Sequence, residues 1–256
     1  MSFSQNKTEF KWPNGAKAAL CLTYDDGLKS HLNTVAPLLK RYNFKATFYP
    51  TMASPSLYED MDQWKALTKD GHELGNHTMY HPCQKSEKGM DWVKAYHNLD
   101  DYTSEQISEE ILLANTMLKA LDGKENRTFA YPCAHFFAGG NSYKPFVSSH
   151  FLSARGSSGE RNELLKLSDI DLYNLPSWAP NGVSSQELIS YIQNIILTET
   201  FSTFTFHGIG AEHLTVSKEA LEAMLEFLNE NRADIWVATV AEVTAYLSAY
   251  RKSMGD

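Results

Sequence analysis

The stretch AALCLTYDDG, residues 18–27, decides the fold class. The run from Ala18 to Tyr24 is almost entirely apolar, which is typical of a strand buried on both faces of a parallel sheet. Asp25, Asp26 and Gly27 then end the run with polar, turn-forming residues. A buried strand followed by a polar turn and a helical segment is the repeating unit of α/β proteins, so we expect that class here.

Strand-like runs alternate with amphipathic helical segments along the rest of the chain, which predicts an α/β protein with a parallel sheet. The predicted strands are 18–24, 46–51, 72–77, 128–132, 150–155, 172–178, 201–208 and 235–240. The predicted helices are 32–42, 61–71, 104–121, 185–198 and 217–231. We expect Ser104 to cap the 104–121 helix, and the polar stretch 82–103 to form a functional loop. About eight strands are close to a closed β/α barrel by count.

The composition indicates one globular domain of barrel size. The chain has 256 residues, of which 43% are hydrophobic and 21% charged. It has no internal repeat or linker, so residues 1–256 are predicted to form a single domain with a core of about 16–245. The formal net charge of -8 argues against a nucleic-acid partner and would repel an anionic polymer, so a neutral substrate fits better.

The cysteines and the N-terminal segment suggest a reduced, cytoplasmic protein. Cys21, Cys83 and Cys133 cannot all pair and form no CxxC motif, so a disulfide framework is not expected. The polar segment 1–15 lacks the features of a signal peptide, although a secreted form with its leader removed would look the same. No apolar run approaches the roughly 20 residues that a membrane span needs, so no membrane is expected. The oligomeric state stays open.

Polar residues follow several predicted strands at the point where each strand ends. In barrels and in open α/β sheets, functional groups collect at the carboxyl ends of the parallel strands. Four separated segments are therefore expected to converge on one rim. They are Asp25–Gly27, His77–His81, Tyr131–Ala134 and His207–Gly208.

The spacing of His77 and His81 predicts a metal site. Imidazoles at i and i+4 lie on one face of a helical turn and can share a cation. Two imidazoles with the carboxylate of Asp26 leave positions open for water and substrate, as in catalytic zinc sites. His207, which follows a buried aromatic strand, is a candidate general acid. Taken singly, Asp25-Asp26-Gly27 also fits a helix-capping turn, and each histidine also fits a structural role.

These residues, in this order, resemble the NodB-type polysaccharide deacetylases, carbohydrate esterase family four. The resemblance covers roughly residues 16–243: TYDDG, NHTMYH, FAYPCA, LPSW and FTFHG are similar to the five family motifs. It implies a distorted (β/α) barrel of seven or eight parallel strands. It also implies that Asp25 is the general base and that His207 is the general acid. Asp26, His77 and His81 would bind Zn²⁺, Co²⁺ or another divalent ion.

The third motif departs from the family pattern, which has an arginine to orient the base and a tyrosine N–H for the oxyanion. Aligned on Pro132, these positions are Ala130 and Cys133. The Cys133 N–H, beside Tyr131, can still donate to an oxyanion. We hypothesise that Arg155 replaces the missing guanidinium, with Arg127 as a second choice.

Two other site residues follow from the same comparison. Trp178 is a candidate wall for the acetyl methyl group, and an ordinary core position is an equal alternative. Cys133 is not expected to be a nucleophile, because no base is in place to activate it.

The predicted function is the metal-dependent removal of N-acetyl groups from an N-acetylated saccharide, with release of acetate. The alternatives are an O-acetyl esterase on an acetylated saccharide, a small-amide hydrolase with the same site, and a non-catalytic sugar-binding relative. Aromatic residues in irregular stretches are candidates for stacking on sugar rings: Trp92, Tyr96, Phe136, Phe137 and Tyr143. The sugar, its chain length and the native metal stay open.

Overall fold

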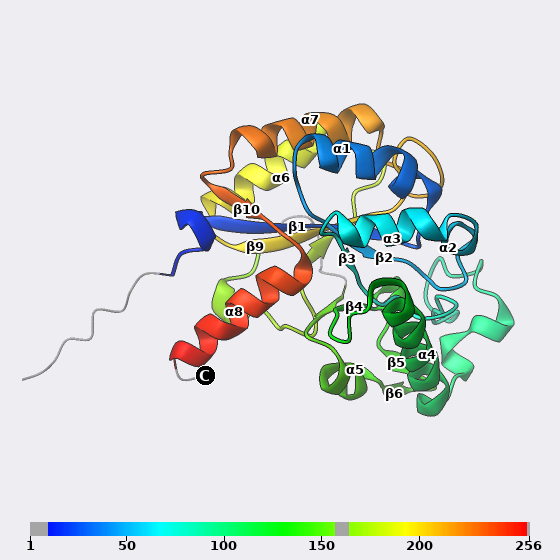
Figure 1. The fold of residues 1–256 in the computed structure, drawn as a ribbon. Helices are drawn as coiled ribbons and strands as arrows, with labels where there is room; N and C mark the ends of the chain where they lie inside the picture. Colours follow the sequence, from blue (N-terminus) through cyan, green and yellow to red (C-terminus); the bar gives the residue numbers. More distant parts are fainter. Residues whose placement is uncertain (1–9, 157–163, 255–256) are drawn as a thin grey trace, which may run out of the picture.

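The protein is an α/β structure organised around parallel strands (Figure 1). The structure, a computed structural model, describes residues 10–156 and 164–254, so residues 1–9 of the predicted leader lie outside the described residues. No helix in these ranges is both long and apolar enough to cross a membrane.

The central strand is β1 (Ala18–Asp25), which is buried along its whole length. On one side it pairs with β9 (Phe201–Phe206). On the other side it pairs first with β10 (Ile235–Val237) and then, toward its carboxyl end, with β2 (Thr47–Tyr49). All three pairings are parallel, so Asp25 lies at the edge where the neighbouring strands also end.

The remaining parallel strands are short: β3 (Glu73–Leu74), β4 (Phe129–Ala130), β7 (Ala154–Arg155) and β8 (Ser177–Trp178). β3 and β8 are the outer strands of a six-stranded sheet with the order β3-β2-β1-β9-β8, in which β10 also pairs with β1. β4 and β7 form a separate pair. Single bridges, Asn76 to Phe129 and Arg155 to Leu175, join the edges of the two sheets. The result is a distorted barrel whose ladders do not close continuously, in agreement with the predicted fold class.

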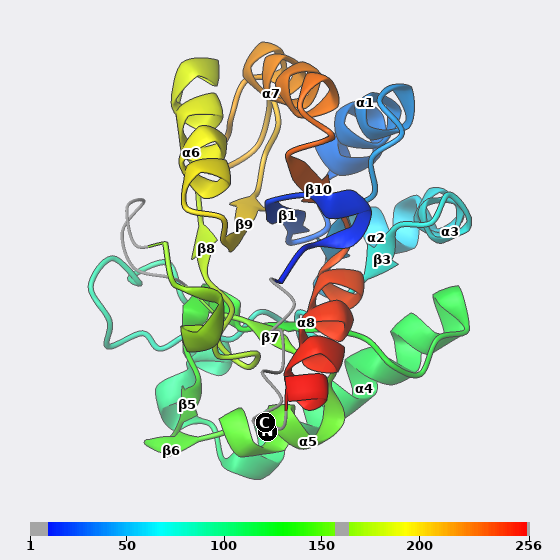
Figure 2. The same ribbon diagram turned by 90° about the vertical axis from the view of Figure 1, so that its left-hand side faces the viewer.

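Helices cover the outside of the strands (Figure 2). Their bounds are α1 (Ala36–Arg41), α2 (Pro55–Glu59), α3 (Met61–Lys69), α4 (Ser104–Asp122), α5 (Lys144–His150), α6 (Ser185–Leu197), α7 (Lys218–Glu230) and α8 (Val240–Met254). A π-helical turn, His31–Val35, precedes α1, and a small hairpin of β5 (Phe137–Ala138) and β6 (Asn141–Ser142) precedes α5. Short 3-10 turns occupy Pro13–Gly15, Ala95–His97, Leu99–Asp101, Pro132–Ala134 and Leu167–Asp169.

Several predicted elements are shorter or differently capped in the structure. The predicted strand 150–155 is reduced to β7, because residues 144–150 form α5 and the chain must turn before pairing with β4. The long helix α4 is capped by Thr103 and not by Ser104: the Thr103 hydroxyl accepts from the Gln106 N–H, and the Gln106 side chain accepts from the Thr103 N–H. α8, which follows β10, was not predicted.

A buried carboxylate ties together the amino ends of three strands and the start of α8. Glu73 is 5% exposed. One of its oxygens accepts from the Thr128 hydroxyl at 2.6 Å and the Thr128 N–H at 3.2 Å. The other accepts from the Thr47 hydroxyl at 2.8 Å and the Ala241 N–H at 3.0 Å. A buried charge is tolerated only when it is fully hydrogen-bonded, and these four donors meet that need.

We expect Glu73→Ala to lower the free energy of unfolding by about 3 kcal/mol, because it leaves buried donors of Thr47, Thr128 and Ala241 without an acceptor. Urea unfolding followed by circular dichroism measures this. Glu226→Ala, at an exposed position of α7, is the matched control and should change stability by less than about 0.5 kcal/mol. Equal stability of the two variants would show that the Glu73 network contributes nothing.

Candidate active site

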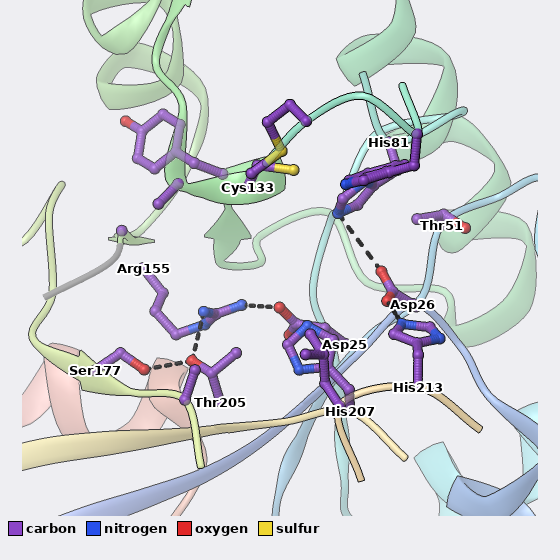
Figure 3. Close-up of a pocket in the computed structure, with 17 residues that line it drawn as sticks. Asp25, Asp26, Thr51, His81, Cys133, Arg155, Ser177, Thr205, His207 and His213 are labelled. Carbon is purple, nitrogen blue, oxygen red and sulfur yellow. Dashed lines mark hydrogen bonds and ion pairs between the residues drawn. The ribbon is translucent and has the colours of Figure 1, made fainter. Parts of the chain in front are cut away.

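A cavity of about 770 Å³ opens at the carboxyl ends of β1, β7, β8 and β9 (Figure 3). Side chains at or after the strands β1, β3, β4, β7, β8 and β9 meet there. The lining includes Asp25, Asp26, His81, Tyr131, Cys133, Arg155, Ser177, Thr205, His207 and His213. The barrel therefore brings together residues that lie far apart in the sequence, such as Asp25 and His213.

Asp26, His77 and His81 form a group suited to a metal ion. Asp26 Oδ1 lies 3.7 Å from His77 Nε2 and 3.6 Å from His81 Nε2, and the three ligand atoms all lie within 4.8 Å of one another. Zinc binds nitrogen and oxygen at about 2.0–2.2 Å, so ligand atoms around one ion are roughly 3–4 Å apart. His77 Nε2 is buried and has no hydrogen-bond partner among the described residues. The group therefore fits a divalent cation.

The two histidines approach each other through a turn, and the predicted helical turn over 77–81 is wrong. Thr78 and His81 have positive φ angles of 63° and 56°. The Thr78 N–H donates to the Asn76 side chain at 2.8 Å, and the His81 N–H donates to the Thr78 hydroxyl at 3.1 Å. These side chains offer the backbone local acceptors that compete with helical hydrogen bonds. The imidazole rings nevertheless lie 4.7 Å apart.

Each of the three candidate ligands has a partner on its far side. His77 Nδ1 lies 2.8 Å from the Ala130 carbonyl, and Asp26 Oδ2 lies 2.8 Å from His213 Nε2. His81 Nδ1 lies 3.5 Å from Cys83 Sγ. Such outer contacts orient metal ligands. His213 was missed by the sequence analysis, although its position six residues after His207, beyond the same strand, could have suggested it.

The protonation states favour metal binding. Burial lowers the pKa of His77 to about 4, so its ring is neutral near pH 7 and keeps a lone pair. For Asp26, burial raises the pKa, but the hydrogen bond from His213 and the nearby imidazoles of His81 and His77 outweigh burial and hold the pKa well below its usual range. Asp26 is therefore ionised across the physiological range.

Asp25 is held by Arg155. The guanidinium Nη2 donates to Asp25 Oδ2, and Nη1 donates to the Thr205 hydroxyl at 2.6 Å. Both charged residues are buried, at 3% exposed for Asp25 and 4% for Arg155. Asp25 Oδ1 has no partner among the described residues. The pairing required for the Arg155 hypothesis is thus present, and one carboxylate oxygen is left unpaired.

Arg127, the second choice, is used elsewhere. Its guanidinium pairs with Asp122 at the end of α4 at 3.2 Å and donates to the Leu74 carbonyl at 2.9 Å. It does not line the cavity. The contacts of Arg127 are therefore structural. Of the two arginines, only Arg155 reaches Asp25.

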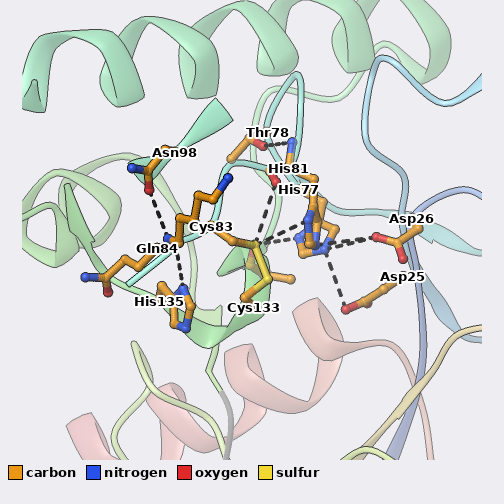
Figure 4. Close-up of a disulfide and its surroundings, with 12 residues drawn as sticks. Asp25, Asp26, His77, Thr78, His81, Cys83, Gln84, Asn98, Cys133 and His135 are labelled. Carbon is orange, nitrogen blue, oxygen red and sulfur yellow. Dashed lines mark hydrogen bonds and ion pairs between the residues drawn. A yellow bond between two sulfur atoms is a disulfide. The ribbon is translucent and has the colours of Figure 1, made fainter. Parts of the chain in front are cut away.

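Cys133 lines the cavity as a disulfide with Cys83, so the expectation of no disulfide is wrong (Figure 4). The two residues are 50 positions apart, and their Cα atoms are 5.9 Å apart. Spacing alone cannot reveal the pair, because it forms only when the segments after β3 and β4 meet at the rim. With its sulfur in a disulfide, Cys133 is not a free thiol nucleophile. Cys21 is buried and unpaired.

His207 and Tyr131 line the cavity, whereas Trp178 does not. Trp178 packs against Tyr191 and Phe204, with ring centroids 4.9 and 5.5 Å apart, so the core alternative describes it and the acetyl-wall prediction is not supported. Its neighbour Ser177 faces the cavity instead.

His207 has an ionisable ring next to both acidic residues of the site. Its Nδ1 is buried without a partner among the described residues. Burial lowers the pKa of His207, while the charges of Asp25 and Asp26 oppose that shift.

The candidate stacking residues divide into two kinds. Trp92 is 59% exposed, lines the cavity and has its ring 6.2 Å from that of His81. Tyr96 and Phe137 are exposed, and Phe136 is half-buried, but none of the three lines the cavity. Tyr143 is 2% exposed within a core cluster, so its prediction as a stacking residue is wrong.

Comparison with known proteins identifies the family. Residues 13–138 match the family model described as polysaccharide deacetylase. The chain is 22% identical over 258 aligned positions to a gellan lyase from Bacillus sp, covering 92% of this chain and 10% of that protein. It is 37% identical over 70 residues to a peptidoglycan-N-acetylglucosamine deacetylase from Bacillus cereus, covering 27% of this chain and 32% of the relative.

Solved structures share the fold. A protein described as a polysaccharide deacetylase from Mycobacterium smegmatis aligns over 94% of both chains with a TM-score of 0.66 at 16% identity. A family 4 acetyl xylan esterase from Clostridium thermocellum, in complex with a cobalt ion, aligns over 89% of this chain and 91% of that one with a TM-score of 0.54 at 16% identity. A family four pseudoenzyme from Bacillus anthracis aligns over 90% and 66% with a TM-score of 0.54 at 18% identity. The chain belongs to the polysaccharide deacetylase family.

We expect His213→Ala to weaken Zn²⁺ binding about 10-fold, because it frees the Asp26 carboxylate from its outer hydrogen bond. Isothermal titration of metal-free protein with Zn²⁺ measures the dissociation constant. His150→Ala, at an exposed position of α5, is the matched control and should bind Zn²⁺ like the unmodified protein. Equal affinities of the two variants would mean that His213 does not position Asp26.

Proposed function

We propose that this protein is a metal-dependent hydrolase that removes N-acetyl groups from an N-acetylated saccharide and releases acetate. One observation carries the proposal: a carboxylate held by a buried arginine, Asp25, adjoins a group of three metal-type ligands at the mouth of a cavity. His77 Nε2 lies 3.7 Å from the Asp25 carboxylate, so an ion in the ligand group and the base would face the same substrate atom.

Asp26, His77 and His81 would hold the ion. A divalent cation such as Zn²⁺ or Co²⁺ supplies Lewis acidity there, which polarises an acyl carbonyl and lowers the pKa of water. Imidazole and carboxylate donors suit both ions.

Asp25 would act as the general base. Its Oδ2 is engaged by Arg155, whereas its Oδ1 is free to accept a proton from an attacking water. The hydrogen bond from the Arg155 guanidinium fixes the orientation of the carboxylate. Thr205 in turn accepts from Arg155 at 2.6 Å and contacts Ser177, which holds the guanidinium in the plane that Asp25 requires.

Attack of water on the acetyl carbonyl gives a tetrahedral oxyanion. The Cys133 N–H would donate to this oxygen, since Cys133 lies on the cavity wall across from Asp25. His207, next to both carboxylates, would protonate the departing amine. The products are acetate and a free amino sugar, and the proton taken by Asp25 balances the one that His207 gives.

A saccharide substrate is supported by the exposed ring of Trp92 on the cavity wall and by the family. A carbohydrate ring stacks on an aromatic face of this kind, and a neutral sugar avoids repulsion by the net charge of -8. The acetyl xylan esterase with the same fold keeps an O-acetyl ester as the second candidate substrate.

The expected result on a panel of N-acetylated oligosaccharides and O-acetylated xylan is acetate release that disappears with a chelator and returns with Zn²⁺ or Co²⁺. Enzymatic assay of acetate measures it. The larger turnover, on amide or on ester, decides between the two substrates. Chelator-insensitive release would contradict the metal mechanism. Metal binding without release from any panel member would favour the small-amide or sugar-binding alternatives.

We expect Arg155→Ala to lower kcat about 100-fold with little change in KM, because the guanidinium is engaged by Asp25 and Thr205, so that its loss chiefly removes the orientation of the base. Arg155→Lys keeps the positive charge but cannot donate to Asp25 and Thr205 from two fixed nitrogens, so it should recover only part of the lost kcat. Arg232→Ala, exposed two residues beyond the end of α7 and outside the cavity lining, is the matched control. Turnover of Arg155→Ala near that of the control would remove Arg155 from the proposed mechanism.

A further inference from the structure

A second group of potential metal ligands adjoins the first. The ligand atoms of His81, Cys83 and Cys133 lie within 4.8 Å of one another (Figure 4). In the structure the two sulfurs are joined, so they are not available as thiolates. Opening the disulfide would leave two thiols and one imidazole around a single point. Thiolate and imidazole together are a ligand set that Zn²⁺ and Co²⁺ bind well, with a fourth position left for water.

His81 belongs to both groups and turns a different nitrogen to each. Its Nε2 lies 3.6 Å from Asp26 Oδ1, and its Nδ1 lies 3.5 Å from Cys83 Sγ. A neutral imidazole has one lone pair, because its other nitrogen carries the proton. His81 can therefore ligate an ion through Nε2 beside Asp26 or through Nδ1 beside the cysteines, but as a neutral ring it cannot do both.

We propose that reduction of the Cys83–Cys133 disulfide creates a thiolate metal site that competes with Asp26 and His77 for His81. The two forms of the protein would then differ in which ligand set holds the ion. An effect on catalysis rests on the proposed function, since the group of Asp26, His77 and His81 is the one that lies beside the proposed base, Asp25.

The reduction is chemically balanced with a dithiol as the reductant. A thiolate of the dithiol attacks the Cys133 sulfur, which is half-buried and lines the cavity, while Cys83 is fully buried. The Cys83–Cys133 bond breaks and a mixed disulfide forms. The second dithiol sulfur then displaces Cys133, so that the protein gains two electrons and two protons and the dithiol becomes a cyclic disulfide. Each cysteine loses its proton when it binds the ion.

The test uses Co²⁺ as the probe, because a thiolate ligand gives a cobalt charge-transfer absorption that imidazole and carboxylate ligands do not give. The whole protein is reduced with a dithiol, freed of it by gel filtration without oxygen, and titrated with Co²⁺. The oxidised protein is treated in parallel. We expect the charge-transfer band only in the reduced protein, with an intensity that saturates at one Co²⁺ per chain.

Two sets of variants identify the sulfur ligands. Cys21→Ser should keep the full band after reduction, because Cys21 is the buried, unpaired cysteine. Cys83→Ser and Cys133→Ser, each leaving one thiol beside His81, should give a weaker band without any reductant. The double variant should give none while still binding Co²⁺ through Asp26, His77 and His81, which also shows that it folds.

Three results would overturn the proposal. They are the absence of the band in protein shown by thiol titration to carry two new thiols, a band that persists in the double variant, and resistance of the disulfide to the dithiol in the folded protein. The outcome is independent of acetate release. If no panel substrate is hydrolysed but the band appears on reduction, the proposed function fails and the thiolate site stands.

Discussion

The arrangement of the site depends on the buried ion pair between Arg155 and Asp25. β7 carries Arg155 in the two-stranded sheet, and β1 carries Asp25 at the centre of the six-stranded sheet. Continuous ladders do not join these sheets, so side chains at the rim take over that task. A buried charge that lost its partner would carry a large desolvation penalty, which ties the positions of the two sheets to each other. The disulfide from the segment after β3 to the segment after β4 adds a covalent link at the same rim. The contacts that join the two sheets at the rim, the Arg155–Asp25 ion pair and the disulfide, are therefore also part of the candidate active site.

Backbone conformations that non-glycine residues seldom adopt gather around the cavity. Asp26, Thr78, His81, Cys133 and Ala134 all have positive φ angles. Such residues carry a cost of order 1–3 kcal/mol each and persist where surrounding contacts over-determine them. Here the contacts are the backbone N–H hydrogen bonds that the Asn76 and Thr78 side chains accept, the disulfide, and the His213 contact to Asp26. The local strain is therefore compensated by the same groups that orient the candidate ligands.

Much of this arrangement could be predicted from the sequence, because it follows from local patterns. The apolar run of β1 and the aromatic run of β9 mark buried parallel strands, and the polar residues that follow them mark the rim. The HxxxH spacing predicted that His77 and His81 lie close together, and they do. The reason differs from the expected helical turn, since the segment is a turn held by hydrogen bonds to the Asn76 and Thr78 side chains. His213 and the disulfide could not be predicted, because each requires knowing which loops meet in space. β4 and β7 fall within the predicted strands 128–132 and 150–155, but each is only two residues long, so their bounds could not be predicted. The family model itself spans residues 13–138 and leaves out Arg155 and His207.

The hydrogen bond from the start of α8 to Glu73 has a consequence for how the protein is made. α8 leaves the ribosome after every strand of the barrel, since β10 is the last of them. Until α8 docks, the N–H of Ala241 is absent from Glu73, and the apolar side chains that meet Val240, Val243 and Leu247 are open to water. Because domains generally fold as units, the barrel cannot reach its final form strand by strand as it emerges. In the nascent chain, the face of the barrel at the amino ends of its strands therefore stays uncovered until α8 forms. No described residue of α8 lines the cavity at the opposite rim.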